Sequence, residues 1–156
     1  MAHKSPPNIL FILADQLTPF ALQQYGNKIV KTPNINRLLA NKTSIKFNSA
    51  YCNSPLCAPS RYSLMTGKLP SNISAYDNAS LLPANVPTFA HYLSKLGYHT
   101  VTAGKMHFVG PDQVHGFSER LTTDIYPADF GWTANWDQVF KDNNQRYDHW
   151  YHNMSS

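Results

Sequence analysis

The sequence predicts an α/β fold with a mainly parallel sheet, and three observations support this prediction. Residues 9–14 form an uninterrupted apolar run, and residues 98–103 form a second strand-like segment. Such segments are typical of strands buried on both faces of a parallel sheet. Helical patterns occupy residues 59–67 and 86–97, between the two segments. Alternation of strands with helices favours an α/β fold.

The composition is that of a globular chain with one core of ordinary size. Of the 156 residues, 42% are hydrophobic and only 14% are charged, which argues against disorder. The net charge is +4, but even the densest basic group, residues 42–46, is too sparse for a nucleic-acid-binding face. The apolar run at residues 9–14 is too short to cross a membrane, and no signal-peptide cleavage pattern follows it. We therefore expect a cytoplasmic protein with neither a nucleic-acid nor a membrane partner.

The first half of the chain contains two predicted helices and a strand after the apolar run. Pro33 opens the first helix and Thr32 caps it, because proline is favoured in a first turn. Residues 45–51 are typical of a strand. The next helix, residues 59–67, ends at Gly67, since glycine readily adopts the left-handed conformation of a helix end.

The third predicted helix, residues 86–97, places Phe89, Leu93 and Leu96 on one face and ends at Gly97. The strand at residues 98–103 follows directly.

Four polar residues are predicted to meet at one edge of the sheet. Asp15, Lys105 and His107 each follow a predicted strand, and Cys57 directly precedes a predicted helix. In open α/β sheets, functional sites collect beyond the carboxyl ends of the strands. Taken singly, Asp15 could be an ordinary turn residue, Lys105 a solvated lysine and His107 a capping histidine. Their joint placement favours a site.

Cys57 is the best candidate for a nucleophile. It is one of two cysteines, and its spacing from Cys52 fits neither a zinc knuckle nor a redox pair. The simpler alternative is a buried cysteine before a helix that Pro59 opens. A helix N-terminus, however, offers N–H groups and a positive dipole end to an anion. Arg61, one turn further, could hydrogen-bond the nucleophile or the anion.

Two motifs resemble the signatures of the sulfatase family. They are Cys57-Ala58-Pro59-Ser60-Arg61 and Gly104-Lys105-Met106-His107. The resemblance implies that a formylglycine-generating maturation enzyme converts Cys57 to formylglycine, whose hydrate is the nucleophile. It implies that Lys105 neutralises sulfate charge and that His107 holds or deprotonates the hydrate. The implied fold is the N-terminal part of an alkaline-phosphatase-like α/β/α sandwich.

The resemblance also implies a divalent cation held by Asp15 and by the converted Cys57. Oxygen ligands favour Ca²⁺, with Mg²⁺ or Mn²⁺ as alternatives, over zinc. Many sulfatases carry two adjacent aspartates where this chain has Asp15 and Gln16. The departure leaves the ligand count and the charge of the site open.

Longer stretches resemble the choline-sulfatases within that family. These stretches are residues 54–61, 76–79, 104–115, 121–132 and 150–153. The resemblance implies choline O-sulfate as the substrate, with Asn78, Trp132 and His152 at its choline end. An aromatic face suits a quaternary ammonium, which cannot donate a hydrogen bond. The alternative for the aromatic residues is packing on the core.

We expect residues 1–7 to be an N-terminal tail and residues 8–156 to be an incomplete, N-terminal portion of the catalytic domain. The later metal ligands of the family cannot be located, so the 156-residue chain alone is expected to be inactive. The full-length protein is expected to be a homo-oligomer. Two alternatives stay open, a formylglycine-dependent phosphonate or phosphate ester hydrolase and an inactive truncated sulfatase.

Overall fold

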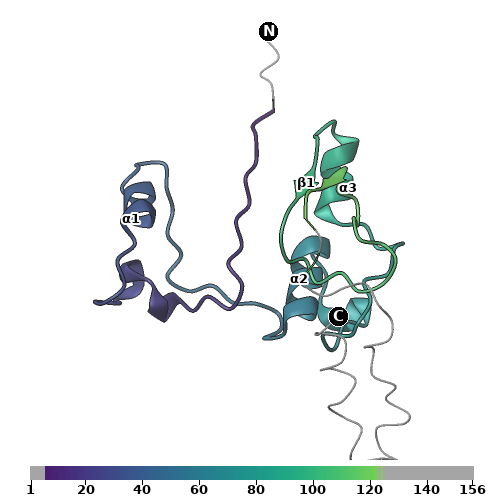
Figure 1. Ribbon diagram of the computed structural model, residues 1–156, viewed down its shortest axis with the longest axis horizontal. Helices are drawn as coiled ribbons and strands as arrows, with labels where there is room; N and C mark the ends of the chain where they lie inside the picture. Colours follow the sequence, from purple (N-terminus) through teal and green to yellow (C-terminus); the bar gives the residue numbers. More distant parts are fainter. Residues whose placement is uncertain (1–5, 123, 125–156) are drawn as a thin grey trace, which may run out of the picture. The chain divides into compact units, whose positions relative to one another are not determined.

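The computed structural model describes residues 6–122 and residue 124 (Figure 1). The chain divides into two compact units, Met1–Ala50 and Tyr51–Ser156, and each is described by itself. Unit 1 holds the predicted residue Asp15. Unit 2 holds most of the candidate site.

Unit 1 contains two short 3-10 helices, η1 (Pro19–Ala21) and η2 (Gln23–Tyr25), and the helix α1 (Pro33–Leu39). Proline occupies the first position of α1, as the sequence predicts. The predicted cap is only partly right, because the Thr32 side chain makes no capping bond and instead accepts a hydrogen bond from Gln24 at 2.8 Å. This bond and a second one, from Asn36 of α1 to Gln23, thus join η2 to the start of α1.

Two strands predicted for the first 51 residues are wrong for the described structure. Residues 9–14 and 45–51 are not strands, and the apolar side chains of the first segment face solvent, with Leu10 84% and Ile12 80% exposed. An apolar run supplies only the propensity for a buried strand, whereas a strand also needs partners on its edges and cover on its faces. Within the described residues, the sheet has only two strands, both in unit 2. No helix among these residues has the length and apolar character needed to cross a membrane.

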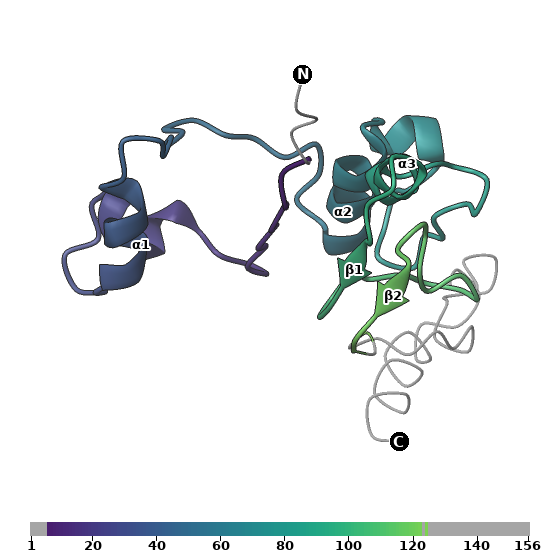
Figure 2. The same ribbon diagram turned by 90° about the horizontal axis from the view of Figure 1, so that it is seen from above.

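Unit 2 contains the helix α2 (Cys57–Thr66), the 3-10 helix η3 (Pro70–Ile73) and the helix α3 (Phe89–Lys95). The strands β1 (Val101–Thr102) and β2 (Glu119–Arg120) pair in parallel, with Val101 opposite Glu119 (Figure 2). Helices with a parallel strand pair agree with the predicted α/β class.

The structure shifts the boundaries of the predicted elements in unit 2. Helix α2 begins at Cys57 itself and ends, as predicted, before Gly67 in the left-handed conformation. Helix α3 is shorter than predicted, because Thr88 forms a capping box with His91 and so sets the helix start. The predicted strand at residues 98–103 contracts to β1, in which Thr102 is buried while Val101 is 40% exposed.

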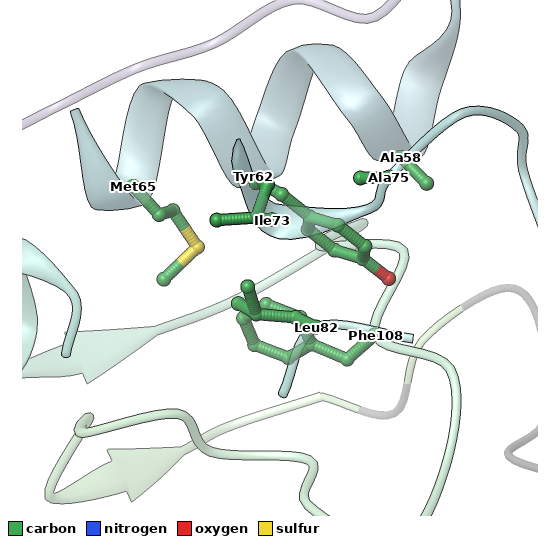
Figure 3. Packing of buried hydrophobic residues seen from close by; sticks show 7 residues of the cluster. All are labelled: Ala58, Tyr62, Met65, Ile73, Ala75, Leu82 and Phe108. Carbon is green, nitrogen blue, oxygen red and sulfur yellow. The ribbon is translucent and has the colours of Figure 1, made fainter. Parts of the chain in front are cut away.

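The core of unit 2 attaches the segment after β1 to helix α2. Figure 3 shows Tyr62 and Met65 of α2 beside Ile73, Leu82 and Phe108. The rings of Tyr62 and Phe108 stack with their centroids 6.5 Å apart. Because Cys57 begins α2 and Lys105 and His107 precede Phe108, burial of these two rings brings the two predicted motifs together.

The contact of Gly116 with His91 predicts a large destabilisation on substitution. Gly116 has φ of +94°, and an added Cβ would lie 2.4 Å from Nδ1 of His91, which accepts a hydrogen bond in the capping box of α3. Gly116→Ala should therefore combine backbone strain of about 1–2 kcal/mol with overpacking of about 1–3 kcal/mol. The measurement is the free energy of unfolding in urea.

Gly97→Ala is the matched control for this prediction. Gly97 also has a positive φ, +87°, but no atom lies within 4 Å of its added Cβ. It should show the strain alone. Equal losses of stability in the two variants would contradict the contact with His91.

Candidate active site

The structure brings together five of the predicted site residues in unit 2. These are Cys57, Arg61, Asn78, Lys105 and His107, which contact one another or the residues next to them in the chain. Asp15 lies in unit 1, so its placement relative to the other five is not part of the described geometry. Trp132 and His152 lie outside the described residues.

Cys57 is half-buried at the first position of α2. The residue before it, Leu56, has no side chain that can cap the helix, and Asn78 supplies the cap instead by accepting a hydrogen bond from the Ala58 amide at 3.0 Å. The Lys105 ammonium lies 3.5 Å from the Cys57 sulfur. A helix N-terminus and a lysine therefore direct positive charge at the candidate nucleophile.

Arg61 is buried one turn after Cys57, and its guanidinium donates a hydrogen bond to the main-chain oxygen of Lys105 at 2.9 Å. The contact joins the nucleophile helix to the backbone of the second motif. Arg61 thereby helps to position the Lys105 ammonium beside Cys57.

His107 is buried, only 1% exposed, and adopts a left-handed backbone with φ of +61°. Its Nε2 lies 2.9 Å from the main-chain oxygen of Asn78. Because a carbonyl oxygen can only accept, Nε2 carries the proton of the neutral ring, and Nδ1 is then the basic nitrogen. Burial lowers the pKa of His107, and the charges of Lys105 and Arg61 lower it further.

Tyr62 is a site-positioning residue that sequence reasoning missed. Its hydroxyl donates to the main-chain oxygen of His107 at 2.6 Å and accepts from the Val109 amide at 3.4 Å. Burial raises the pKa of Tyr62 to about 12, so the phenol keeps its proton for the contact with His107. Its helical spacing from Ala58 and Met65 indicates a core face, but no local pattern indicates a partner 45 residues away.

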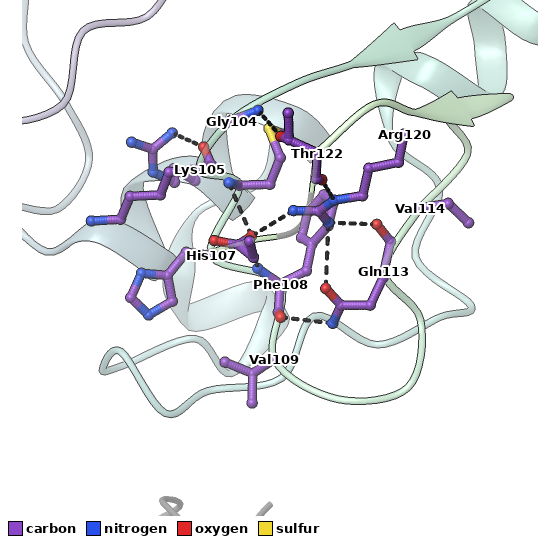
Figure 4. Close-up of polar contacts among 12 residues, drawn as sticks. Gly104, Lys105, His107, Phe108, Val109, Gln113, Val114, Arg120 and Thr122 are labelled. Carbon is purple, nitrogen blue, oxygen red and sulfur yellow. Dashed lines mark hydrogen bonds and ion pairs between the residues drawn. The ribbon is translucent and has the colours of Figure 1, made fainter. Parts of the chain in front are cut away.

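A second missed group includes Gln113, Arg120 and Thr122, which Figure 4 shows on the other side of the Lys105–His107 segment. Its fourth member is Asp124, which accepts a hydrogen bond from Arg120. Arg120 and Asp124 form an ion pair at 2.9 Å, with the Asp124 side chain 1% exposed. The four-residue spacing of the pair would suggest a helix, yet Arg120 ends a strand. Sequence reasoning assigned residues 121–132 to aromatic packing or ligand binding and so overlooked the pair.

The donor set for a metal ion is incomplete in the described part of the chain. No group of three or more histidine, cysteine, aspartate or glutamate side chains gathers there. The Asp15 carboxylate suits a hard cation, whereas the Cys57 thiol does not unless it is converted to an oxygen group. Asp15, and position 57 once it is converted, fit the predicted cation in chemistry but do not by themselves form its site.

The arrangement in unit 2 suits attack by the residue at position 57 on an anionic substrate. The N-terminus of α2 and the Lys105 ammonium favour negative charge at this point, as in sites that bind phosphate or sulfate groups. A neutral His107, held nearby through Asn78, can accept a proton.

Comparison with known proteins shows the sulfatase family model matching residues 7–155. The choline-sulfatase of Rhizobium meliloti is 50% identical over 150 residues, which are 96% of this chain and 28% of that protein. The arylsulfatase A of Bos taurus is 39% identical over 133 residues, 78% of this chain and 26% of that protein. The chain thus spans about a quarter of the length of these curated relatives.

A solved structure, described as a complex with its substrate D-glucosamine-2-N,6-O-disulfate, superposes with a TM-score of 0.58 and 33% identity. The match covers 64% of this chain and 19% of that one. It supports the predicted fold class and the N-terminal position of this chain within it.

We expect the protein to lose stability in mild acid because two of its histidines, His107 and His115, are buried. Burial lowers the pKa of His107 and of His115 from the ordinary value of 6.5. Both therefore favour the neutral form when folded. Their contribution to the free energy of unfolding is fully present above pH 6.5 and is lost as the pH drops from 6.5 toward their folded pKa values. Urea unfolding at about pH 7.5 and about pH 5.5 should show lower stability at the lower pH, and His115→Gln should reduce this difference. The same pH dependence in both proteins would contradict the role of His115.

Proposed function

Because the chain belongs to the sulfatase family, we propose that this protein hydrolyses sulfate esters and that its substrate is choline O-sulfate. The observation that carries the reaction class is Cys57 at the N-terminus of α2 with the Lys105 ammonium 3.5 Å from its sulfur. The 50% identity to a choline-sulfatase supports the choice of substrate.

In the proposed reaction, a maturation enzyme first converts Cys57 to formylglycine, which hydrates to a geminal diol. One hydroxyl of the diol attacks sulfur as its proton passes to water, and the bond from sulfur to the choline oxygen breaks. Choline leaves with a proton from a group beyond this 156-residue chain. The α2 amides and Lys105 stabilise the charge on the sulfate oxygens. His107 then removes the proton of the second hydroxyl, the bond from the diol carbon to the sulfate oxygen breaks, and the aldehyde is restored.

The pKa of His107 supports its part in this scheme. Because burial lowers that pKa, the imidazole is neutral near pH 7 and can accept a proton through Nδ1. The hydrogen bond from Nε2 to the main chain of Asn78 holds the ring in the required tautomer.

We propose Asp15 and an oxygen of the residue at position 57 as two ligands of a divalent cation, most simply Ca²⁺, with Mg²⁺ or Mn²⁺ as alternatives. When bound, the cation supplies positive charge that polarises the sulfate oxygens. Asp15 offers the hard oxygen donor that such ions prefer.

The choline end of the substrate is proposed to contact Trp132 and His152, with Asn78 nearby. The Asn78 side-chain oxygen accepts one hydrogen bond, from the Ala58 amide, and its second lone pair can face the ammonium of choline. Trp132 supplies the aromatic face for the cation.

A formylglycine-dependent phosphate or phosphonate ester hydrolase is the second candidate, because the positive charge at Cys57 suits either anion. Side-by-side turnover of choline O-sulfate and a phosphate diester by the full-length protein separates the two. The homo-oligomeric state, the cytoplasmic location and the inactivity of the 156-residue chain alone stay predictions.

Cys57→Ala in the full-length protein should lower the rate of sulfate release by about 10³-fold or more, because it removes the nucleophile. The measurement is sulfate released from choline O-sulfate. The exposed Cys52 provides the matched control, and Cys52→Ala should retain the wild-type rate. Wild-type sulfate release by Cys57→Ala would refute the scheme.

Trp132→Ala should raise KM for choline O-sulfate by about ten-fold, the effect expected for a lost cation–π contact of 1–2 kcal/mol. KM for an aryl sulfate, which carries no ammonium, should change much less. The comparison of the two substrates on one variant controls for general damage to the site. Equal changes for both substrates would exclude the cation–π contact.

A further inference from the structure

We propose that Asp124, in its ion pair with Arg120, is a positioning residue that holds the Lys105–His107 segment against the nucleophile helix. The proposal rests on the proposed function, because it assigns Asp124 a part in the same reaction. Asp124 acts in this proposal through Lys105 and His107, because its carboxylate binds the main chain on both sides of His107.

The first observation is that the Asp124 carboxylate accepts two hydrogen bonds from the main chain. Its Oδ2 accepts hydrogen bonds from the Met106 amide at 3.1 Å and from the Phe108 amide at 3.3 Å. These two amides flank His107 on either side. Convergence of nearby N–H groups on one oxygen is the geometry of backbone nests that bind anions. Here the anion is a side chain of the protein itself.

The second observation is the backbone conformation of His107, which lies between the two amides that Asp124 binds. His107 has φ of +61°, a left-handed conformation that costs a residue with a side chain about 1–2 kcal/mol. Such conformations persist where surrounding contacts enforce them, and they concentrate at functional sites. The contacts of Asp124 on both sides of His107 provide that enforcement.

The third observation is that the two kinds of main-chain group in this segment point to different partners. The carbonyl oxygens of Lys105 and His107 accept from Arg61 and Tyr62, both on α2. The amides of the alternate residues, 106 and 108, donate to Asp124. The segment is therefore held between the nucleophile helix on one side and the ion pair on the other.

The ion pair is itself fixed by its surroundings. Arg120 donates to the main-chain oxygens of Gln113 at 2.7 Å and Thr122 at 2.8 Å, and its guanidinium lies 5.6 Å from the centre of the Phe108 ring (Figure 4). The Thr122 hydroxyl accepts from the Gly104 amide at 2.6 Å. Because Arg120 pairs with Thr102 in the strand register, the β1–β2 pair sets where the carboxylate of Asp124 lies.

The test is Asp124→Asn in the full-length protein, with choline O-sulfate as the substrate. We expect kcat to fall by about 10²-fold, the loss typical of catalytic groups displaced by about 1 Å, with KM changed much less. The negative charge of Asp124 raises the pKa of His107, so its loss should move the acid limb of the kcat profile to lower pH. Hydrogen exchange at the Met106 and Phe108 amides should become faster.

Asp112→Asn is the matched control. The Asp112 carboxylate likewise accepts from two main-chain amides, those of Val114 and His115, but in a loop that carries none of the proposed catalytic residues. It should keep the wild-type kcat and the slow exchange at Met106 and Phe108. If Asp124→Asn matched Asp112→Asn in kcat, acid limb and exchange, the proposal would be overturned.

Asp124→Glu separates geometry from charge and serves if Asp124→Asn fails to fold. It keeps the charge but moves the carboxylate by one methylene, so kcat should fall by about ten-fold while the acid limb stays in place. An unchanged kcat would overturn the positioning role. If the wild-type protein hydrolyses no sulfate ester, the proposed function fails, and amide exchange at Met106 and Phe108 then decides the role of Asp124 alone.

Discussion

The chemistry of unit 2 depends on how the main chain of residues 105–109, half-buried at its start and buried from His107 onward, satisfies its hydrogen bonds. This segment cannot form a long strand, since β1 ends at Thr102 and His107 is left-handed. From His107 onward the segment is nevertheless buried, and each hydrogen bond left unmade there would cost about 1–3 kcal/mol. Side chains from α2 and from the region after β2 supply the partners. The same bonds that stabilise the segment place Lys105 and His107 beside Cys57.

Electrostatics in this site follows from the same arrangement. The N-terminus of α2, Lys105 and Arg61 concentrate positive charge near Cys57, whereas the negative charge of Asp124 is engaged on the far side with Arg120. A buried histidine between these groups favours its neutral form. The side of the segment that faces Cys57 is thereby suited to an anionic substrate. On the opposite side, Arg120 neutralises the charge of Asp124, and Asp124 holds the segment in place.

Comparison of the predicted and observed elements shows which sequence signals were sufficient to predict a helix or a strand. Helices α1 and α2 follow their local signals, Pro33 at the start of one and Gly67 at the end of the other. The apolar run at residues 9–14 carries an equally strong signal, yet it forms no strand in the described structure. Helix signals act within a few residues of each other, whereas a strand depends on partners remote in the sequence.

The sequence by itself determined the family, the two motifs and the presence of a helix next to the nucleophile, because each depends on residues close together in the chain. The tertiary structure alone decided which residues support the motifs. Tyr62 reaches His107 across 45 residues, Asn78 caps α2 from 20 residues away, and Asp124 holds the amides around His107. No local spacing encodes these contacts, because they arise only when burial of Tyr62 and Phe108 brings distant segments together.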